Sequence, residues 1–344
     1  MGKDTAIGWT DDTWNPAVGC SKVSAGCRGC YMMRDQARYG RDGSVVRRTA
    51  PGAFDLPVQR DRQGAWKLAP GRLVFVASLT DVFHPDLDGF RDEVWARMER
   101  RPDLLFLVLT KRPERIAGRL PAWWGEYGPA NVALGVSAED QAAWDARVPI
   151  LRSVRARLRF VSVEPMIGPI SNPHGLSTLE SYLEHADACG LAAPPEDRIY
   201  ASGIGWVIIG GESGPLARPM HPRWAKDLIQ ACEASSVPVY FKQWGQWKPI
   251  SDMTEPEYGR IYRSNRKARD GEDQGEIDDI YGKTCTVPTL SLGVNGEHLD
   301  LRHPQAFWTG RQAMQAWRVG TRASGRVIDG RTYDHRPTWP LELP

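Results

Sequence analysis

The sequence predicts an α/β fold in which parallel strands form a complete or partial (β/α) barrel, similar to a TIM barrel. From residue 72 onward, short apolar runs alternate with amphipathic stretches, the pattern of successive βα units. Almost every run ends in charged or hydroxyl residues, and the carboxyl ends of barrel strands carry the active site. The 344 residues, 41% of them hydrophobic, are enough for a large core. A doubly wound open sheet is the alternative.

The predicted strands are the apolar runs, and the amphipathic stretches between them are predicted helices. Together with a strand just before Cys20, about seven parallel strands are expected. The six apolar runs are residues 73–78, 104–110, 132–137, 158–163, 206–210 and 237–242. The predicted helices span 90–101, 138–155 and 222–235, and the last begins with Pro222 in a first-turn position.

The barrel is expected to occupy residues 1–250, and residues 251–344 form a C-terminal extension or cap. Residues 171–204 interrupt the βα rhythm with proline- and glycine-rich segments, so they are predicted to be an insertion. In the extension, residues 252–276 mix arginines with Tyr258 and Tyr262. That mixture suits either a nucleic-acid contact or a solvated loop.

Composition indicates a soluble protein. No apolar run approaches the ~20 residues of a membrane span, and the first residues are polar, so we expect a cytoplasmic protein with no membrane contact. A net charge of +2 does not by itself indicate a nucleic-acid-binding protein.

Three of the six cysteines lie within eleven residues, at Cys20, Cys27 and Cys30. Three thiolates on one loop indicate a metal site. Structural zinc and a fully ligated 4Fe-4S cluster both take four protein ligands, so three cysteines leave one position open. An open iron of a 4Fe-4S cluster is where S-adenosylmethionine binds through its amine and carboxylate for reductive cleavage. A zinc ion completed by a distant His or Cys is the alternative.

The segment Trp14-Asn-Pro-Ala-Val-Gly-Cys20 and the later Cys27-Arg-Gly-Cys30-Tyr31 resemble the opening of a phage-associated, radical-SAM-like family known mainly as a domain of unknown function. Further segments carry the same resemblance. They are residues 110–113, 162–165, 210–214, 241–245 and 329–331. The resemblance implies a radical-SAM type of barrel, a 4Fe-4S cluster, S-adenosylmethionine, and an electron donor such as flavodoxin or ferredoxin.

The polar ends of the predicted strands supply the candidate site residues. For S-adenosylmethionine we expect Asp81 to bind the ammonium group, and Lys111 or Arg112 to bind the carboxylate. The ribose is assigned to one of two Ser and Glu pairs, and glycine amides are candidates for an anionic group. These candidates are Ser137 with Glu139, Ser162 with Glu164, and Gly210 with Gly211. The expected catalytic residues are Asp81, Glu164, Glu212 and Lys242.

Three functions follow from these observations. The first is a radical-SAM enzyme that produces a 5′-deoxyadenosyl radical acting on a nucleic-acid base or nucleotide, in modification or repair. The second is a zinc-containing, non-catalytic nucleic-acid-binding protein. The third is a barrel hydrolase or nuclease that uses Asp81, Glu164 and Glu212 on divalent metal ions, which requires the three carboxylates to converge.

Overall fold

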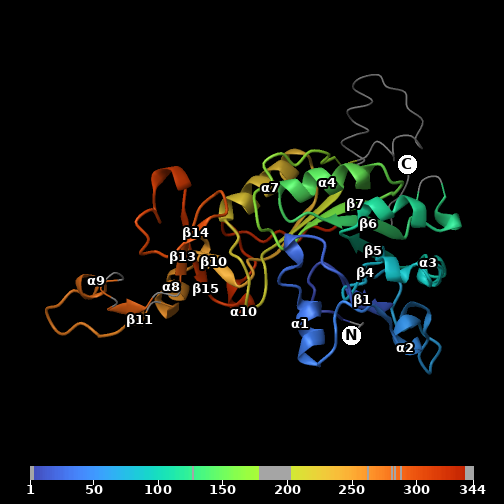
Figure 1. Cartoon of the computed structure of the whole chain (residues 1–344), viewed down its shortest axis with the longest axis horizontal. Helices are drawn as coiled ribbons and strands as arrows, with labels where there is room; N and C mark the ends of the chain where they lie inside the picture. The colour runs from blue at the N-terminus through green and yellow to red at the C-terminus, as the bar shows by residue number, and fades with distance from the viewer. Residues whose placement is uncertain are drawn as a thin grey trace, which may run out of the picture.

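The computed structural model describes residues 4–125, 128–177, 203–261, 263–279, 282, 284–286 and 289–337. Its centre is a curled sheet of seven parallel strands, a half-barrel, in the order β1-β4-β5-β6-β7-β8-β9 (Figure 1). The strands are β1 (Asp12–Trp14), β4 (Leu73–Val76), β5 (Leu105–Thr110), β6 (Val132–Ser137), β7 (Arg159–Val163), β8 (Trp206–Gly210) and β9 (Val239–Gln243).

The prediction of about seven parallel strands is confirmed, and the barrel is partial. Strand order follows the chain without a reversal, whereas a doubly wound sheet changes direction at a switch point. The doubly wound alternative is therefore wrong. The strands were predictable because a parallel sheet is covered on both faces, so that β5 to β8 are almost continuously apolar and buried.

Helices cover the outer face of the half-barrel. The three predicted helices are α3 (Arg91–Glu99), α4 (Gln141–Arg152) and α7 (Pro222–Ala234). Their Trp95, Trp144 and Trp224 side chains belong to one large buried cluster with the outward-facing strand residues. Figure 1 shows α4 and α7 side by side along the sheet. Asp140 caps α4 by accepting a hydrogen bond from the backbone N–H of Ala143, at 2.9 Å.

The inner face of the half-barrel is apolar near the amino ends of the strands. Trp9 lies in this concavity, with its ring centroid 4.6 Å from that of Phe75 and 6.1 Å from that of Trp206. Phe160 and Tyr240 belong to the same buried cluster. Aromatic rings fill a concave space with few side chains. The polar inner face therefore begins only toward the carboxyl ends.

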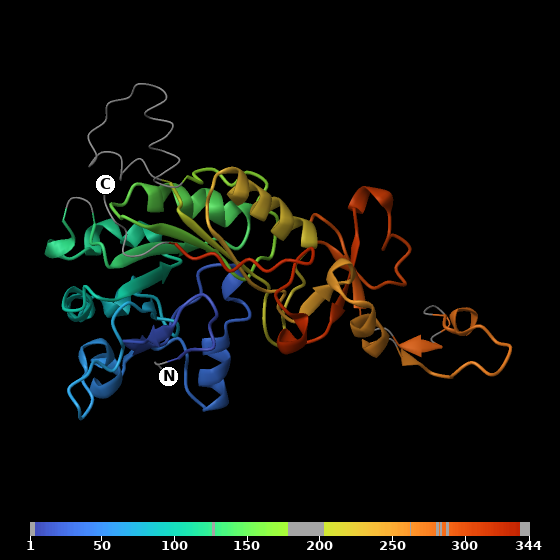
Figure 2. The same cartoon turned by 180° about the vertical axis from the view of Figure 1, so that it is seen from behind.

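The C-terminal segment of the described chain returns to the half-barrel and covers its open side. The backbone N–H of Phe241 donates to the Tyr333 carbonyl at 2.9 Å, which adds this segment to the free edge of β9. Arg336 then reaches the other end of the sheet and pairs with Asp11 at 2.9 Å. Figure 2 shows this red segment running along the sheet.

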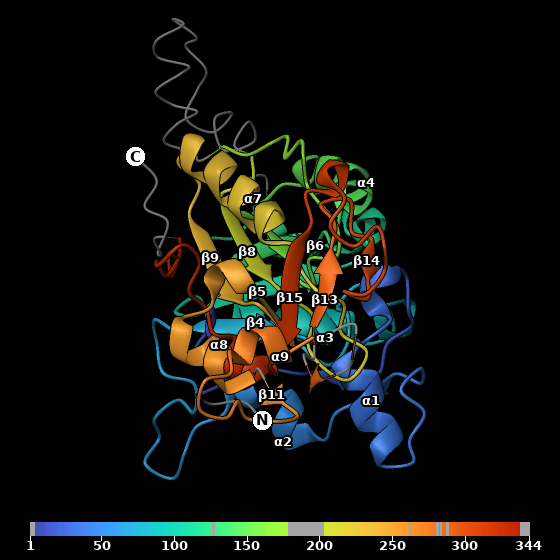
Figure 3. The ribbon, with the colours of Figure 1, turned by 90° about the vertical axis from the view of Figure 1, so that its left-hand side faces the viewer.

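The C-terminal extension, together with β10 just before it, forms a second, antiparallel sheet in the order β10-β15-β13-β14. Its strands are β10 (Trp247–Pro249), β13 (Thr289–Leu292), β14 (His298–Leu299) and β15 (Met314–Arg318). This sheet packs beside α7, where the indole N–H of Trp224 donates to the Val294 carbonyl at 2.6 Å. Figure 3 shows β13 and β15 in front of the large sheet.

Short elements complete the chain. An arm of α9 and the β11-β12 pair projects away from both sheets (Figures 1 and 2). The remaining elements are α1 (Tyr31–Arg38), β2 (Ala17–Val18), β3 (Arg47–Arg48), α2 (Pro51–Phe54), α8 (Glu255–Ile261), β11 (Arg263–Ser264), α9 (Gln274–Ile277), β12 (Cys285–Thr286) and α10 (Thr321–Ser324).

The predicted insertion at 171–204 falls largely on residues 178–202, which lie outside the described residues. Its two flanks meet in a parallel bridge between Leu176 and Ile204. Across the described part of the chain, no helix combines the length and apolar character that a bilayer span requires.

Candidate functional site

The loop that carries the three cysteines lies at the carboxyl edge of the half-barrel, between β2 and α1. Its start is fixed to the segment that follows β4. The backbone N–H of Gly19 donates to the Leu79 carbonyl at 3.0 Å, and the Thr80 hydroxyl donates to the Gly19 carbonyl at 2.6 Å. Gly19 has a φ of +113°, a conformation that L side chains rarely adopt. The turn into Cys20 therefore requires glycine.

The residues flanking the cysteines hold that same segment from two sides. Asn15, in the Trp-Asn-Pro sequence, accepts a hydrogen bond from the backbone N–H of Leu79 at 2.8 Å and donates to the Ser78 hydroxyl at 3.0 Å. Tyr31, directly after Cys30, donates its hydroxyl to the Ser78 carbonyl. Asn15 and Tyr31, which flank the cysteines in the sequence, therefore position the loop on the sheet edge.

Asp81, at the end of the segment after β4, accepts four hydrogen bonds from the protein. Oδ1 accepts from the Thr110 hydroxyl at 2.7 Å and from the backbone N–H of Phe83 at 2.9 Å. Oδ2 accepts from the backbone N–H of Lys111 at 3.1 Å and from Arg112 at 3.0 Å. A carboxylate has about four lone-pair positions, so this buried side chain has its acceptor capacity used within the fold.

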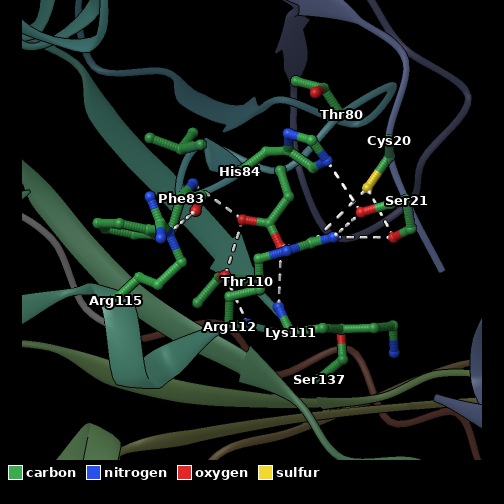
Figure 4. A network of polar contacts seen from close by, with 12 residues as sticks. Cys20, Ser21, Thr80, Phe83, His84, Thr110, Lys111, Arg112, Arg115 and Ser137 are labelled. Carbon is green, nitrogen blue, oxygen red and sulfur yellow. Dashed lines mark hydrogen bonds and ion pairs between the residues drawn. The ribbon is translucent and has the colours of Figure 1, made fainter. Parts of the chain in front are cut away.

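Arg112 connects Asp81 to the cysteine loop, and Figure 4 shows its side chain reaching Ser21 and Cys20. Its Nη1 lies 3.6 Å from Sγ of Cys20, and Nη2 donates to both the carbonyl and the hydroxyl of Ser21 at 2.8 Å. Burial, with Asp81 close by, raises the pKa of the Cys20 thiol to about 11, and Arg112 opposes part of that rise. A metal that binds Cys20 must therefore displace a proton from it.

His84 completes this network through Ser21. Nδ1 of His84 accepts the backbone N–H of Asp86 at 3.2 Å, which assigns the ring proton to Nε2. Nε2 lies 2.9 Å from the Ser21 hydroxyl and donates to it. Because Ser21 also accepts from Arg112, its own hydroxyl hydrogen is available to a further acceptor. Burial, assisted by Arg112, lowers the pKa of His84, so the imidazole is neutral at pH 7.

Glu139, after β6, holds the middle of the cysteine loop. Its Oε1 accepts the backbone N–H of Gly26 at 3.2 Å, while Oε2 pairs with Lys111 at 3.2 Å and with Arg147 at 2.8 Å. Burial alone raises the pKa of Glu139, but Lys111, the Ser24 hydroxyl and Arg147 outweigh burial and lower it to about 2. Glu139 is therefore an ionised, fully engaged carboxylate.

Glu212, after β8, supports the end of the loop in a similar way. Arg218 donates to it three times, from its backbone N–H at 2.8 Å and from Nε and Nη2 at 2.7 Å. Arg218 also donates to the Ala25 carbonyl at 3.0 Å. A Cβ added at Gly29 would lie 2.8 Å from Oε1 of Glu212, so only glycine fits where the loop crosses this carboxylate.

A partly exposed ion pair lies beside these buried networks. Lys242 of β9 donates to Glu164, after β7, at 2.6 Å. The Glu164 side chain is 20% exposed, against 7% for Asp81 and 1% for Glu139. A Cβ at Gly210 would come within 3.2 Å of the Glu164 carboxyl carbon.

Ser137 and Ser162 are partners in the β6-β7 register, and both are buried. Their strand neighbours Val136 and Val161 belong to the helix-covered cluster. Because side chains alternate across a strand, the two serines project to the inner face of the half-barrel. They continue the polar layer at the carboxyl end.

The structure brings most of the predicted site residues to one edge, but in separate pairs. Asp81 pairs with Arg112, Glu164 with Lys242 and Glu212 with Arg218. Within the described residues no three His, Cys, Asp or Glu side chains converge closely enough to hold a single metal ion. Each of these carboxylates is neutralised by its own cation.

Sequence reasoning missed several residues of this site. Arg147 lies within α4 and Arg218 in the loop before α7, where a single arginine in a polar stretch gives no signal. Ser21, between two candidate ligands, was also missed. One clue was available in the sequence. Arg147 follows Glu139 by about two helical turns, and this spacing brings a side chain of the helix back to the end of the preceding strand.

Comparison with known proteins identifies the family. The model of a family described as "Protein of unknown function (DUF5131)" matches residues 4–337. The chain belongs to the DUF5131 family. No curated protein and no solved structure matches it. Because the match covers the half-barrel and the C-terminal extension together, the DUF5131 unit includes the small sheet and the arm as well as the cysteine loop.

Proposed function

We propose that this chain is a radical-SAM enzyme, in which a 4Fe-4S cluster on Cys20, Cys27 and Cys30 reductively cleaves S-adenosylmethionine to a 5′-deoxyadenosyl radical that acts on a nucleic-acid base or nucleotide. The observation that carries the proposal is the anchoring of one three-cysteine loop to three strand ends, those of β5, β6 and β8. Arg112, Glu139 and Glu212 each contact a different part of that loop. The strand ends of a half-barrel are where such folds place their chemistry.

The donor set fits the cluster. Thiolates are the ligands that iron–sulfur clusters take, and three of them leave one iron open for a small molecule. In a cubane cluster each cysteine binds a different iron, so the three sulfurs need not converge on a common point as they must around a single ion. The backbone of Gly26 and Gly29 lies against Glu139 and Glu212, and a Cβ at either glycine would collide with those carboxylates.

The protein groups around the loop have two roles. Asp81, Arg112, Glu139 and Glu212 position the loop, and the Arg112 guanidinium offsets negative charge at Cys20. Asp81 accepts four hydrogen bonds within the fold, so its role in this proposal is positioning instead of binding an ammonium group.

The ligand-binding role falls to the more open inner face. Glu164 is the carboxylate with the exposure to accept a hydrogen bond from the amino group of S-adenosylmethionine, and Lys242 sets its charge and orientation. Ser137 and Ser162 offer hydroxyls in the same layer, and the backbone of Gly210 lies against Glu164. An electron donor such as flavodoxin or ferredoxin is required, and a reducing cytoplasm keeps the thiols available.

The alternatives find less support. The interpretation as a nucleic-acid-binding zinc protein depended on the five cations of residues 260–269, but six carboxylates follow them in residues 270–279. Arg266 pairs with Glu272 at 2.6 Å, and phosphate binding depends on unneutralised positive charge. A divalent-metal hydrolase needs converging carboxylates, whereas Asp81, Glu164 and Glu212 each pair with a different cation.

The test is anaerobic purification followed by quantification of iron and sulfide and by EPR of the dithionite-reduced protein. About four irons per chain, a spectrum changed by S-adenosylmethionine, and formation of 5′-deoxyadenosine support the proposal. A matched variant, Cys20→Ser, should lose iron, while Cys232→Ser, a buried cysteine of α7, should retain it. Stoichiometric zinc without iron would overturn the proposal.

A further inference from the structure

Among the described residues, Arg34 differs from the other partly buried cations around the cysteine loop because no carboxylate pairs with it. Lys111, Arg112, Arg147, Arg218 and Lys242 each pair with a carboxylate. Nε of Arg34 is buried and has no hydrogen-bond partner among the described residues. An unpaired, desolvated guanidinium nitrogen is costly and indicates a missing acceptor.

The position of Arg34 ties it to the proposed cluster. Arg34 lies one helical turn after Cys30, and its backbone N–H donates to the Cys30 carbonyl at 3.3 Å. Its guanidinium lies on the loop after β8, where an ideal Cβ on Gly214 would be 1.9 Å from Nη1. Gly214 also has a φ of +104°. A side chain at Gly214 would displace the guanidinium, so the glycine leaves the space that Arg34 fills.

We propose that Arg34, together with the loop of residues 212–214, binds an oxyanion of the small-molecule ligand beside the cysteine loop. Arginine presents a planar fork of donors that matches a carboxylate or a phosphate. Two sources carry this chemistry at the proposed site, the carboxylate of S-adenosylmethionine and the phosphate of a nucleotide. The inference rests on the proposed function for the identity of the ligand, but not for the anion subsite itself.

The experiment compares probes that carry the oxyanion with counterparts that lack it, by isothermal titration calorimetry on the full chain, purified anaerobically. S-Adenosylhomocysteine against its decarboxylated analogue, which keeps the amino group, tests the carboxylate, and 5′-AMP against adenosine tests the phosphate. We expect the wild type to prefer the oxyanion-bearing member of one pair by about ten- to a hundredfold, the range of a charge-assisted hydrogen bond. Whichever pair shows the preference identifies the source of the oxyanion.

Variants of α1 assign the preference to Arg34. Arg34→Gln should abolish it, Arg34→Lys should retain part of it because the charge remains without the fork, and Arg38→Gln should leave it unchanged. Arg38 is an exposed arginine one turn later on the same helix, which makes it the matched control.

Equal affinities within both probe pairs for the wild type, or a preference that survives in Arg34→Gln, would overturn the proposal. If Arg34→Gln does not fold, as judged by its melting transition, the comparison between Arg34→Lys and Arg38→Gln decides. The calorimetry does not require bound iron. If protein that holds no iron still prefers the oxyanion-bearing probe, the anion subsite is supported although the radical-SAM function fails.

Discussion

The guanidinium of Arg112 lies 3.6 Å from the sulfur of Cys20 while it also pairs with the buried carboxylate of Asp81 at 3.0 Å. Both members of the ion pair are almost fully buried. Removing one partner of such a pair leaves an uncompensated buried charge, which costs about 3–5 kcal/mol, whereas replacing both partners costs less. The pair therefore links the stability of the fold to the position of the cysteine loop.

We predict that Arg112→Gln lowers the free energy of unfolding by about 3 kcal/mol or more and reduces the iron bound per chain. Urea denaturation and iron quantification measure the two effects. The double variant Arg112→Gln with Asp81→Asn should recover part of the stability, because no unpaired charge remains. Arg302→Gln, which breaks an exposed pair with Asp300, should cost less than about 1 kcal/mol. Equal losses for Arg112→Gln and Arg302→Gln would contradict the prediction.

The low pKa of Glu139 predicts how stability depends on pH. The pKa in the folded protein, about 2, lies below its ordinary value of 4.5, so the ionised form stabilises the fold. This contribution, ~3 kcal/mol, is complete above pH 4.5 and is lost as the pH falls from 4.5 toward 2.

Urea titrations of wild type and Glu139→Gln at several pH values measure this contribution. The difference in stability between the two proteins should be large at pH 7 and should shrink below pH 4.5. Glu114→Gln, which changes an exposed glutamate, controls for the loss of a surface charge. A difference that stays constant down to pH 3 would show that Glu139 does not carry the pH dependence.

The glycines of the cysteine loop give a steric prediction. A Cβ at Gly29 would lie 2.8 Å from a carboxylate oxygen of Glu212, which Arg218 holds in place. We predict that Gly29→Ala displaces the loop, costs about 1–3 kcal/mol of stability and lowers the iron content. Gly118→Ala is the control, because nothing lies within 4 Å of its added Cβ. If Gly29→Ala binds as much iron per chain as Gly118→Ala, the proposed dependence of iron binding on the packing of the loop against Glu212 is contradicted.

The sequence predicted the large sheet well because each parallel strand is buried on both faces and appears as a continuous apolar run. β6, at Val132–Ser137, coincides with the predicted 132–137, and β8 coincides with 206–210. The strands of the extension were not predicted in the same way. β14 has two residues and β10 has three, too few to show a periodicity.

The positions of the candidate residues at one sheet edge could be predicted from the sequence, whereas their ion-pair partners could not. Residues at strand ends share an edge because parallel strands all point the same way, so Asp81, Glu139 and Glu212 could be placed together from sequence. Which cation faces which carboxylate depends on helix rotation and loop path. Arg147 reaches Glu139 from within α4, and no local pattern specifies that contact. The unpaired state of Arg34 was unpredictable for the same reason.

Variants of the ion pair between Glu164 and Lys242 test ligand binding with little expected effect on the stability of the fold. Both side chains are partly exposed, at 20% and 25%, so the pair itself is worth less than about 1 kcal/mol. If this pair lies where S-adenosylmethionine binds, Glu164→Gln and Lys242→Met should each lower the rate of 5′-deoxyadenosine formation by tenfold or more, the size expected for a lost charge-assisted contact. Their melting temperatures and iron contents should match the wild type.

Lys226→Met is the matched control for that prediction. Lys226, on α7 and away from the cysteine loop, is about as exposed as Lys242, at 31%, and pairs with Asp329 at 2.5 Å. The rate of 5′-deoxyadenosine formation by Lys226→Met should equal that of the wild type. If Glu164→Gln and Lys242→Met also keep the wild-type rate while iron is bound, the inner face of the half-barrel is not the ligand site. If they lose iron together with the rate, the pair supports the cysteine loop instead, because a ligand contact alone leaves iron in place.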